Sequence, residues 1–179
     1  MWQRCRTLRD VSAYHWEVNP EGYLRWVHSG KPVYQEINAW GYPVTKIGRK
    51  TISFHRIQLE TFKPQPHPKL ECDHRNACKL DFSLPNLRWV THALNVSFCN
   101  NHKGYTQPSP GVYRARFRDK RYGWFRTVLA AREEYFYQKS CWQREERERI
   151  ISMLSLSRKQ AIAALNWDER DDVYFFVDF

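Results

Sequence analysis

Short runs of alternating apolar and polar side chains fill the first third of the chain and predict β-strands separated by turns. Residues 16–18 alternate and stop at residues 19–22, which are of the types that favour a turn, and residues 23–27 resume the pattern. Residues 42–47 and 51–55 flank a short basic segment with a glycine, which is typical of a β-hairpin. The first part of the chain is therefore expected to form short antiparallel sheets.

The period changes next, where Ile57, Leu59 and Phe62 indicate a helix over residues 55–62. Three prolines end this helix and hold the following loop extended: Pro64, Pro66 and Pro68.

A second group of elements follows this loop. Residues 70–74 form the expected strand, and residues 76–85 form the connecting turn. Asn86 begins a second short strand or the entry to a helix. Thr91 is the expected N-cap of a helix with apolar members.

Strict alternation returns at residues 112–118. Its apolar members are Tyr113, Ala115 and Phe117, and its alternate members are Arg114, Arg116 and Arg118. Successive side chains of a strand point to opposite faces, so the pattern predicts three arginines on one face of a sheet, or else an ordinary solvated face. Residues 119–123 are expected to turn the chain, residues 124–128 with Arg126 to return it, and residues 130–139 to cover the apolar face as a helix.

Residues 141–179 mix acidic and basic side chains and predict two helices, followed by an acidic and aromatic end that packs as a last strand or binds a partner. The fold class expected from these patterns is α+β, with short antiparallel β-sheets and C-terminal helices. Four segments are expected: 1–53, 54–103, 104–140 and 141–179.

The positive charge is uneven along the chain. Of the formal net charge of +10, residues 1–140 carry 23 Lys or Arg and 11 Asp or Glu, whereas residues 141–179 carry 6 and 8. Neutralising phosphates supplies most non-specific affinity for nucleic acids, so a polyanion partner is indicated, with a merely basic soluble surface as the alternative. No apolar run is long enough to span a membrane, and the amino terminus lacks a signal-peptide core, so a soluble cytoplasmic protein is expected.

Five cysteines form an odd set without a Cys-x-x-Cys pair, which favours reduced thiols. Cys72, Cys78 and Cys99 could join His102 in a zinc site, but their spacing fits no standard zinc pattern, which disfavours structural zinc.

The candidate chemistry lies in residues 54–95. Asp73 and His74 are adjacent, Asn86 follows twelve residues after His74, and Asn95 nine residues after Asn86. A carboxylate beside an imidazole can hold a hard cation while the imidazole takes a proton from water. An acid, an imidazole and two carboxamides in this order therefore suit a metal-dependent site that cuts phosphodiesters. The alternative is a structural turn in which His74 is hydrogen-bonded to a neighbouring carbonyl group.

This order of residues resembles the His-Asn-His (HNH, His-Me finger or ββα-metal) nucleases, specifically their phage and intron homing branch. The matching blocks are the His55-Arg56 pair, the Asp73-His74 pair, residues 86–91 and Asn95. The resemblance covers roughly residues 10 to 100 and implies a small ββα-metal nuclease finger, flanked by the antiparallel sheets, in residues 54–103.

The resemblance also implies a role for each residue of the site. His74 is the expected general base, Asn86 orients its ring, and Asp73 and Asn95 hold one Mg²⁺ or Mn²⁺ ion. The candidate phosphate clamps are Arg56, Arg75 and Arg88.

Two histidines remain uncertain within this resemblance. Asn95 stands where many members carry a second histidine, and an amide oxygen there still suits Mg²⁺. His92, three residues earlier, is the alternative ligand. For His55 a structural or DNA-contacting role is favoured over catalysis.

Residues 104–140 resemble the AP2-type DNA-binding module, a three-stranded sheet backed by one helix. The matching features are residues 111–113, the alternating arginines, the returning aromatic strand and the following helix. The resemblance implies that Arg114, Arg116, Arg118 and Arg126 contact DNA.

The function expected from these resemblances is a site-specific, metal-dependent endonuclease. Its partner is double-stranded DNA, it needs no small-molecule cofactor, and it acts as a monomer. Two alternatives stay open: a catalytically silent DNA-binding protein derived from a homing enzyme, and a nuclease on RNA or structured nucleic acid. A silent relative is expected to have lost Asp73, His74 or Asn86, and this chain retains all three.

Overall fold

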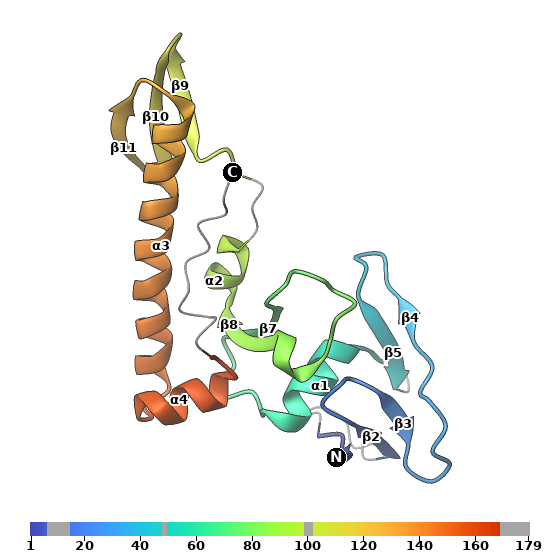
Figure 1. Cartoon of the computed structure of the whole chain (residues 1–179). Helices are drawn as coiled ribbons and strands as arrows, with labels where there is room; N and C mark the ends of the chain where they lie inside the picture. The colour runs from blue at the N-terminus through green and yellow to red at the C-terminus, as the bar shows by residue number, and fades with distance from the viewer. Residues whose placement is uncertain (7–14, 48–49, 99–101, 169–179) are drawn as a thin grey trace. The chain divides into compact units, whose positions relative to one another are not determined.

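The computed structural model describes residues 1–6, 15–47, 50–98 and 102–168 (Figure 1). The chain divides into two compact units. The first comprises Met1–Thr91 and Leu156–Trp167, and the second comprises His92–Ser155 and the segment from Asp168 onward. Short antiparallel sheets and C-terminal helices make up these units, which confirms the α+β class.

Two three-stranded antiparallel sheets begin the first unit. One consists of β1 (Gln3–Arg4), β2 (Trp16–Val18) and β3 (Leu24–Trp26). The other consists of β4 (Glu36–Ile37), β5 (Pro43–Ile47) and β6 (Lys50–Ser53). The predicted hairpin is confirmed, since β5 pairs with β6, although Lys50 belongs to the strand and not to the turn. The turn residues 48–49 lie outside the described part.

Helix α1 (Phe54–Phe62) follows β6 directly and supplies the core of this unit. It confirms the predicted helix and ends at Lys63, whose backbone N–H donates to Leu59 O, just before the first proline. The buried apolar cluster joins α1 to the first sheet. Its members are Cys5, Trp16, Val18, Leu24, Val33, Phe54 and Ile57.

A second strand pair lies against α1. Strand β7 (Leu70–His74) pairs antiparallel with β8 (Leu87–Thr91), which the 3-10 turn η2 (Leu84–Asn86) precedes. Both predicted strands are thus confirmed. Every residue of β8 except Thr91 is buried, and the Trp89 indole donates to Lys63 O at 2.9 Å. Helix α4 (Arg158–Leu165) returns to β8 and opens with a Ser157–Gln160 capping box.

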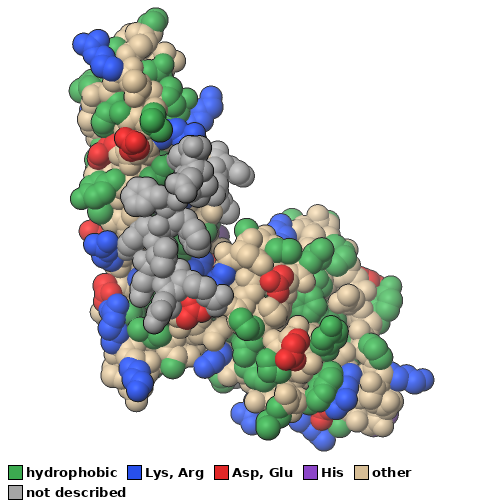
Figure 2. All heavy atoms as spheres, in the orientation of Figure 1, with side chains coloured by type: hydrophobic (Ala, Val, Ile, Leu, Met, Phe, Trp, Pro, Cys, Tyr) green, Lys and Arg blue, Asp and Glu red, His purple; other side chains and the backbone are tan. Residues whose placement is uncertain are grey.

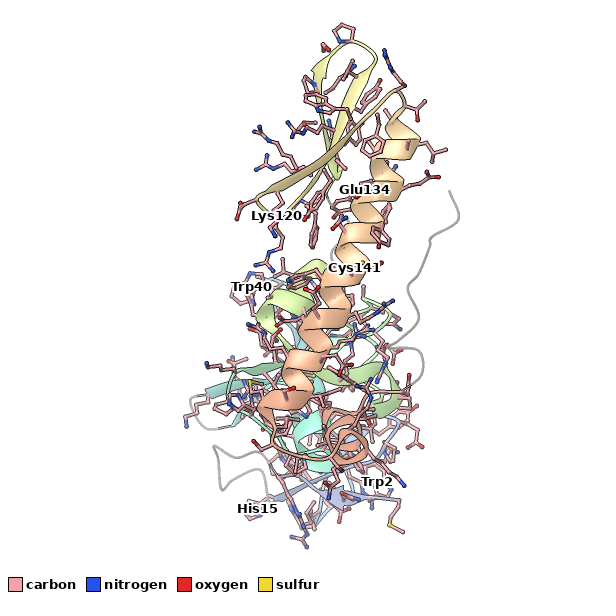
Figure 3. All side chains as sticks on the ribbon, turned by 90° about the vertical axis from the view of Figure 1, so that its left-hand side faces the viewer. Trp2, His15, Trp40, Lys120, Glu134 and Cys141 are labelled. Atoms are coloured by element: carbon pink, nitrogen blue, oxygen red, sulfur yellow. The ribbon has the colours of Figure 1, made fainter. Side chains whose placement is uncertain are left out.

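The second unit holds α2 (His92–Ser97), a three-stranded antiparallel sheet and the long helix α3 (Val128–Met153). The sheet has the order β11 (Lys120–Phe125), β10 (Val112–Phe117), β9 (Tyr105–Ser109) and packs against the first turns of α3 (Figures 1 and 3). Ala131 and Tyr135 are buried, and the Tyr135 ring lies 5.8 Å from that of Phe117. The predicted cover over the apolar face is therefore present, whereas the likeness to an AP2 module stays a prediction.

Helix α3 is longer than predicted. The helices expected over 130–139 and from residue 145 onward are one continuous element of 26 residues, visible along its length in Figure 3. No glycine or proline interrupts residues 128–153, so nothing local ends the first half. The segment boundary expected between 140 and 141 lies inside this helix. The predicted last strand falls on residues 169–179, outside the described part.

The strand predicted over residues 112–118 is present as β10, but it ends at Phe117, so Arg118 is not on the predicted arginine face. The register shifts beside Arg114 place the extra residues on β9 and β11, so β10 itself is not bulged there. Arg118 lies beyond the strand with φ 54°, in a tight turn that pairs Phe117 with Lys120. The returning strand therefore starts at Lys120 and not at residue 124. Arg126 falls between β11 and α3, outside either element.

Candidate active site

Asp73 and His74 are the last two residues of β7, and the register places Asp73 opposite Arg88 and His74 opposite Leu87. Both side chains are buried although they are ionisable. Strand β7 pairs with the buried strand β8 and also contacts α1, which accounts for the burial of both side chains. The pairing predicted to carry the chemistry is therefore part of the structural core.

Arg88 is the direct partner of Asp73. Its Nε and Nη2 lie 2.9 and 2.8 Å from the same oxygen, Oδ2, and the two side chains are only 7% and 11% exposed. Burial raises the pKa of Asp73, and the Arg88 guanidinium partly offsets this rise. Arg88 was expected to clamp a phosphate; in the described structure its guanidinium holds the carboxylate instead.

Two aromatic rings surround the His74 imidazole. The His55 ring centroid lies 4.9 Å away and that of Tyr42 lies 5.9 Å away, and Tyr42 and His55 are 5.1 Å apart. Burial lowers the pKa of His74 to about 4, with Asp81 raising it and Lys79 lowering it further. Burial, then His74 and Arg56, lower the pKa of His55 to about 3. Both imidazoles are therefore neutral near pH 7, the form that accepts a proton.

The hydrogen bonds of the Asn86 carboxamide in the described part of the chain go to Asn76 and Asp81, so its expected role toward the His74 ring stays a prediction. Its Nδ2 donates to Asn76 Oδ1 at 2.9 Å and to Asp81 O at 2.6 Å, and its Oδ1 accepts from Asn76 N. The carboxamide thus holds the loop between β7 and β8. This loop carries Lys79 and Asp81, so Asn86 acts on the site through it.

Arg75 also has protein partners. Its Nη1 donates to Pro85 O and Leu87 O, both at 2.8 Å, and its Nη2 donates to Asn166 O. Its role as a phosphate clamp stays a prediction, and binding a phosphate would require Arg75 to give up hydrogen bonds to these carbonyl groups. Arg56 remains more available, with a side chain 38% exposed beside Glu60.

The C-terminal end of α4 hydrogen-bonds backbone groups of η2 and β8, and these contacts were not predicted from the sequence. Asn166 Nδ2 donates to Leu84 O at 3.0 Å and Leu87 O at 2.6 Å, and Trp167 Nε1 donates to Trp89 O at 2.9 Å. Asn166 adopts φ 56°, a left-handed conformation that asparagine tolerates after a helix. An asparagine directly after an apolar helix is the local signal for such a cap, but nothing local identifies the backbone groups that it binds.

Asn95 and His92 lie on α2 in the second unit, where Asn95 is half-buried and His92 is exposed. Their predicted roles toward a metal ion stay predictions.

The donors in the first unit fit a hard cation in part. Among the described residues, no three His, Cys, Asp or Glu side chains gather into a metal-binding cluster. Asp73 offers the carboxylate oxygen that Mg²⁺ prefers, while Arg88 occupies its Oδ2. The Cys72 thiol donates to His55 O at 3.6 Å, and burial raises its pKa well above the usual value, so it stays a thiol. Cys99 of the alternative zinc set lies outside the described residues.

The described basic side chains do not gather into one patch on the face shown in Figure 2, where Lys and Arg are scattered among acidic and apolar side chains. Arg116, Arg118 and Arg126 are exposed, and Arg114 is half-buried with its guanidinium 4.6 Å from the Trp124 ring centroid. The Arg118 guanidinium likewise lies 4.7 Å from the Trp142 ring centroid. In the described part of the chain, no helix has the length and apolar character needed to cross a membrane.

No protein-family model matches the chain. Among characterised proteins, DNA endonuclease I-HmuI of Bacillus phage SP01 is 32% identical over 94 residues, which are 49% of this chain and 54% of that enzyme. A solved structure of DNA binding and cleavage by the HNH homing endonuclease I-HmuI covers 54% of this chain and 55% of its own, with 28% identity and a TM-score of 0.45. The chain thus spans about half the length of the relative that it matches, and over that half it is similar to an HNH homing endonuclease.

Proposed function

We propose that the chain is a metal-dependent DNA endonuclease of the HNH type that hydrolyses phosphodiester bonds. The observation that carries this proposal is the buried, neutral His74 imidazole at the end of β7, packed against His55 and directly after Asp73 in the sequence. The similarity to a DNA endonuclease over half the chain supports the same reaction class.

His74 acts as the general base in this proposal. Its neutral ring takes a proton from a water molecule, the water oxygen forms a bond to phosphorus, and the bond from phosphorus to the leaving oxygen breaks. A proton acceptor packed between the rings of His55 and Tyr42 keeps its orientation from one turnover to the next. His74 therefore carries the chemical step, and its loss removes that step.

Asp73 and Asn95 are the residues that would hold Mg²⁺ or Mn²⁺. When bound, the cation supplies positive charge that stabilises the phosphate as negative charge develops. Asp73 would offer a carboxylate oxygen to the cation from a buried position, where Arg88 orients the carboxylate and binds its Oδ2. Arg88 is thus assigned to orienting Asp73 in place of gripping a phosphate.

The partner proposed for this site is double-stranded DNA. The candidates for phosphate contact in the second unit are its exposed arginines Arg116, Arg118 and Arg126. In the first unit the candidate is Arg56, beside the site. Arg114 stacks on Trp124 and is assigned a smaller share of the affinity.

A catalytically silent DNA-binding protein is the second candidate. One observation favours it: the Asp73 carboxylate, needed for the metal, is already paired with Arg88 at 2.8 Å.

A plasmid assay separates the two candidates. Supercoiled DNA is incubated with purified protein, with Mg²⁺, with Mn²⁺ and with chelator, and conversion to open-circular or linear DNA is measured. A nuclease converts the plasmid only with metal, and His74→Ala abolishes conversion while binding a duplex nearly as well as the parent. His28→Phe, a change at an exposed imidazole of the same unit, is the matched control and should cut at the parental rate. Binding without any metal-dependent cutting supports the silent protein.

A further inference from the structure

Two neighbouring histidine rings of the first unit each have a buried nitrogen without a partner among the described residues. Nδ1 of His55, in the first turn of α1, and Nε2 of His74, at the end of β7, are both buried and have no hydrogen-bond partner among the described residues. The two ring centroids are 4.9 Å apart and the ring planes make an angle of 68°. A buried ring nitrogen without a partner destabilises the fold, so two such nitrogens on neighbouring rings call for an explanation.

The separation of the rings matches that of a hydrogen-bonded pair. Two imidazoles joined by an N–H···N bond of roughly 2.9 Å have ring centroids about 5 Å apart. The terminal torsion of a histidine side chain is broad, so either ring can rotate toward the other without moving the backbone. The Tyr42 ring, 5.1 Å from His55 and 5.9 Å from His74, limits the space into which either ring can turn away.

The hydrogen balance also suits a pair. A neutral imidazole has one N–H donor and one acceptor nitrogen. If Nε2 of His74 carries the hydrogen, Nδ1 of His55 can accept it. The second nitrogen of His74, Nδ1, then keeps its lone pair for a proton from water.

We propose that His55 is a positioning residue of the active site, whose Nδ1 accepts a hydrogen bond from Nε2–H of His74 and so fixes the tautomer in which Nδ1 of His74 is the base. This assignment rests on the proposed nuclease function. It gives His55 an orienting task toward the His74 ring, whereas the Asn86 carboxamide is bound to Asn76 and Asp81. Partners that fix the tautomer of a working histidine are a general device of such sites.

The competing explanation is that His55 only fills space as an aromatic ring. The variants His55→Phe and His55→Asn distinguish the two, since phenylalanine keeps the ring without an acceptor and the asparagine amide places an acceptor close to the position of Nδ1. His28→Phe is the control for loss of an imidazole elsewhere in the unit. Single-turnover cleavage with Mg²⁺, duplex binding and the ¹⁵N spectrum of the histidine rings are measured for each protein.

We expect His55→Phe to slow cleavage about 10–100-fold with unchanged DNA binding, and His55→Asn to recover most of the rate. In the parent, the His74 ring, identified by the loss of its signals in His74→Ala, should be the Nε2–H tautomer, and in His55→Phe it should be a mixture. A parental cleavage rate in His55→Phe overturns the proposal, as does the Nδ1–H tautomer of His74 in the parent. If the parent cuts no DNA with any metal, the nuclease function fails, whereas the tautomer spectrum still decides the pairing. The parental spectrum also decides it if His55→Phe does not fold.

Discussion

The Asp73–Arg88 pair should be a strong stability determinant of the first unit, and Arg88→Met tests this. The two residues are directly opposite each other in the β7–β8 register, and Nε and Nη2 of Arg88 lie within 2.9 Å of one carboxylate oxygen. With side chains only 7% and 11% exposed, water cannot replace the lost guanidinium. Removing one partner of such a pair costs about 3–5 kcal/mol, because a buried charge is left uncompensated.

The penalty should depend on pH in a defined direction. Burial already raises the pKa of Asp73, and without Arg88 nothing opposes that rise. A carboxyl group whose folded pKa lies above its unfolded value binds its proton more tightly in the folded state. The cost of Arg88→Met is therefore greatest near pH 7 and shrinks as the pH falls toward the unfolded pKa of about 4.

Urea unfolding at pH 7 and pH 5 measures both effects. The double variant Asp73→Leu/Arg88→Met replaces the pair with apolar side chains and should be far more stable than Arg88→Met alone. Arg116→Met, at an exposed position of β10, is the control and should change the free energy of unfolding by about 0.5 kcal/mol or less. A cost below about 1 kcal/mol for Arg88→Met at pH 7, or a double variant as unstable as the sum of the single changes, would refute the reasoning.

Three further predictions concern other parts of the chain. The pKa of His55 is lowered to about 3 from an unfolded value near 6.5, so its contribution to the free energy of unfolding is complete above pH 6.5 and is lost as the pH falls. Between pH 7 and pH 5 the free energy of unfolding of the parent should fall by about 2 kcal/mol through this group, and that of His55→Phe should fall by less in the same titration. Asn166→Ala removes two hydrogen bonds, to Leu84 O of η2 and to Leu87 O at the start of β8, and should cost about 1–3 kcal/mol in thermal unfolding. Asn166→Gly keeps the left-handed backbone and should separate the effect of the bonds from that of the conformation; an unchanged melting temperature in both variants would contradict a stabilising role for these bonds. Replacing Arg114, Arg116 and Arg118 by alanine should lower the magnitude of the slope of log K against log salt for duplex DNA by at most about 2.7. The change should be smaller if Arg114 stays on Trp124, and an unchanged slope would mean that these arginines are solvated and do not contact DNA.

Local signals in the sequence determined most of the short elements of the first unit. The alternating runs, the apolar spacing of residues 55–62 and the prolines after it act over a few residues, so they specify β5, β6, α1 and β7 without reference to the rest of the chain. The same locality explains the errors in the second unit. The alternation at residues 112–118 does not show that β10 ends at Phe117, before Arg118, and polarity in mid-helix does not end α3 without a glycine or proline.

The residue types of the candidate site were also visible in the sequence, but their partners were not. Asp73, His74 and Asn86 stand in a recognisable order, whereas only the strand register brings Arg88 onto Asp73, and only the packing of α1 brings His55 beside His74. Asn86 and Arg75 bind a loop and the end of α4, which returns from far along the chain. Hydrogen-bond partners depend on which backbone and side-chain groups are left unpaired once the strands and helices have packed, and that outcome is non-local, so the tertiary structure alone decided it.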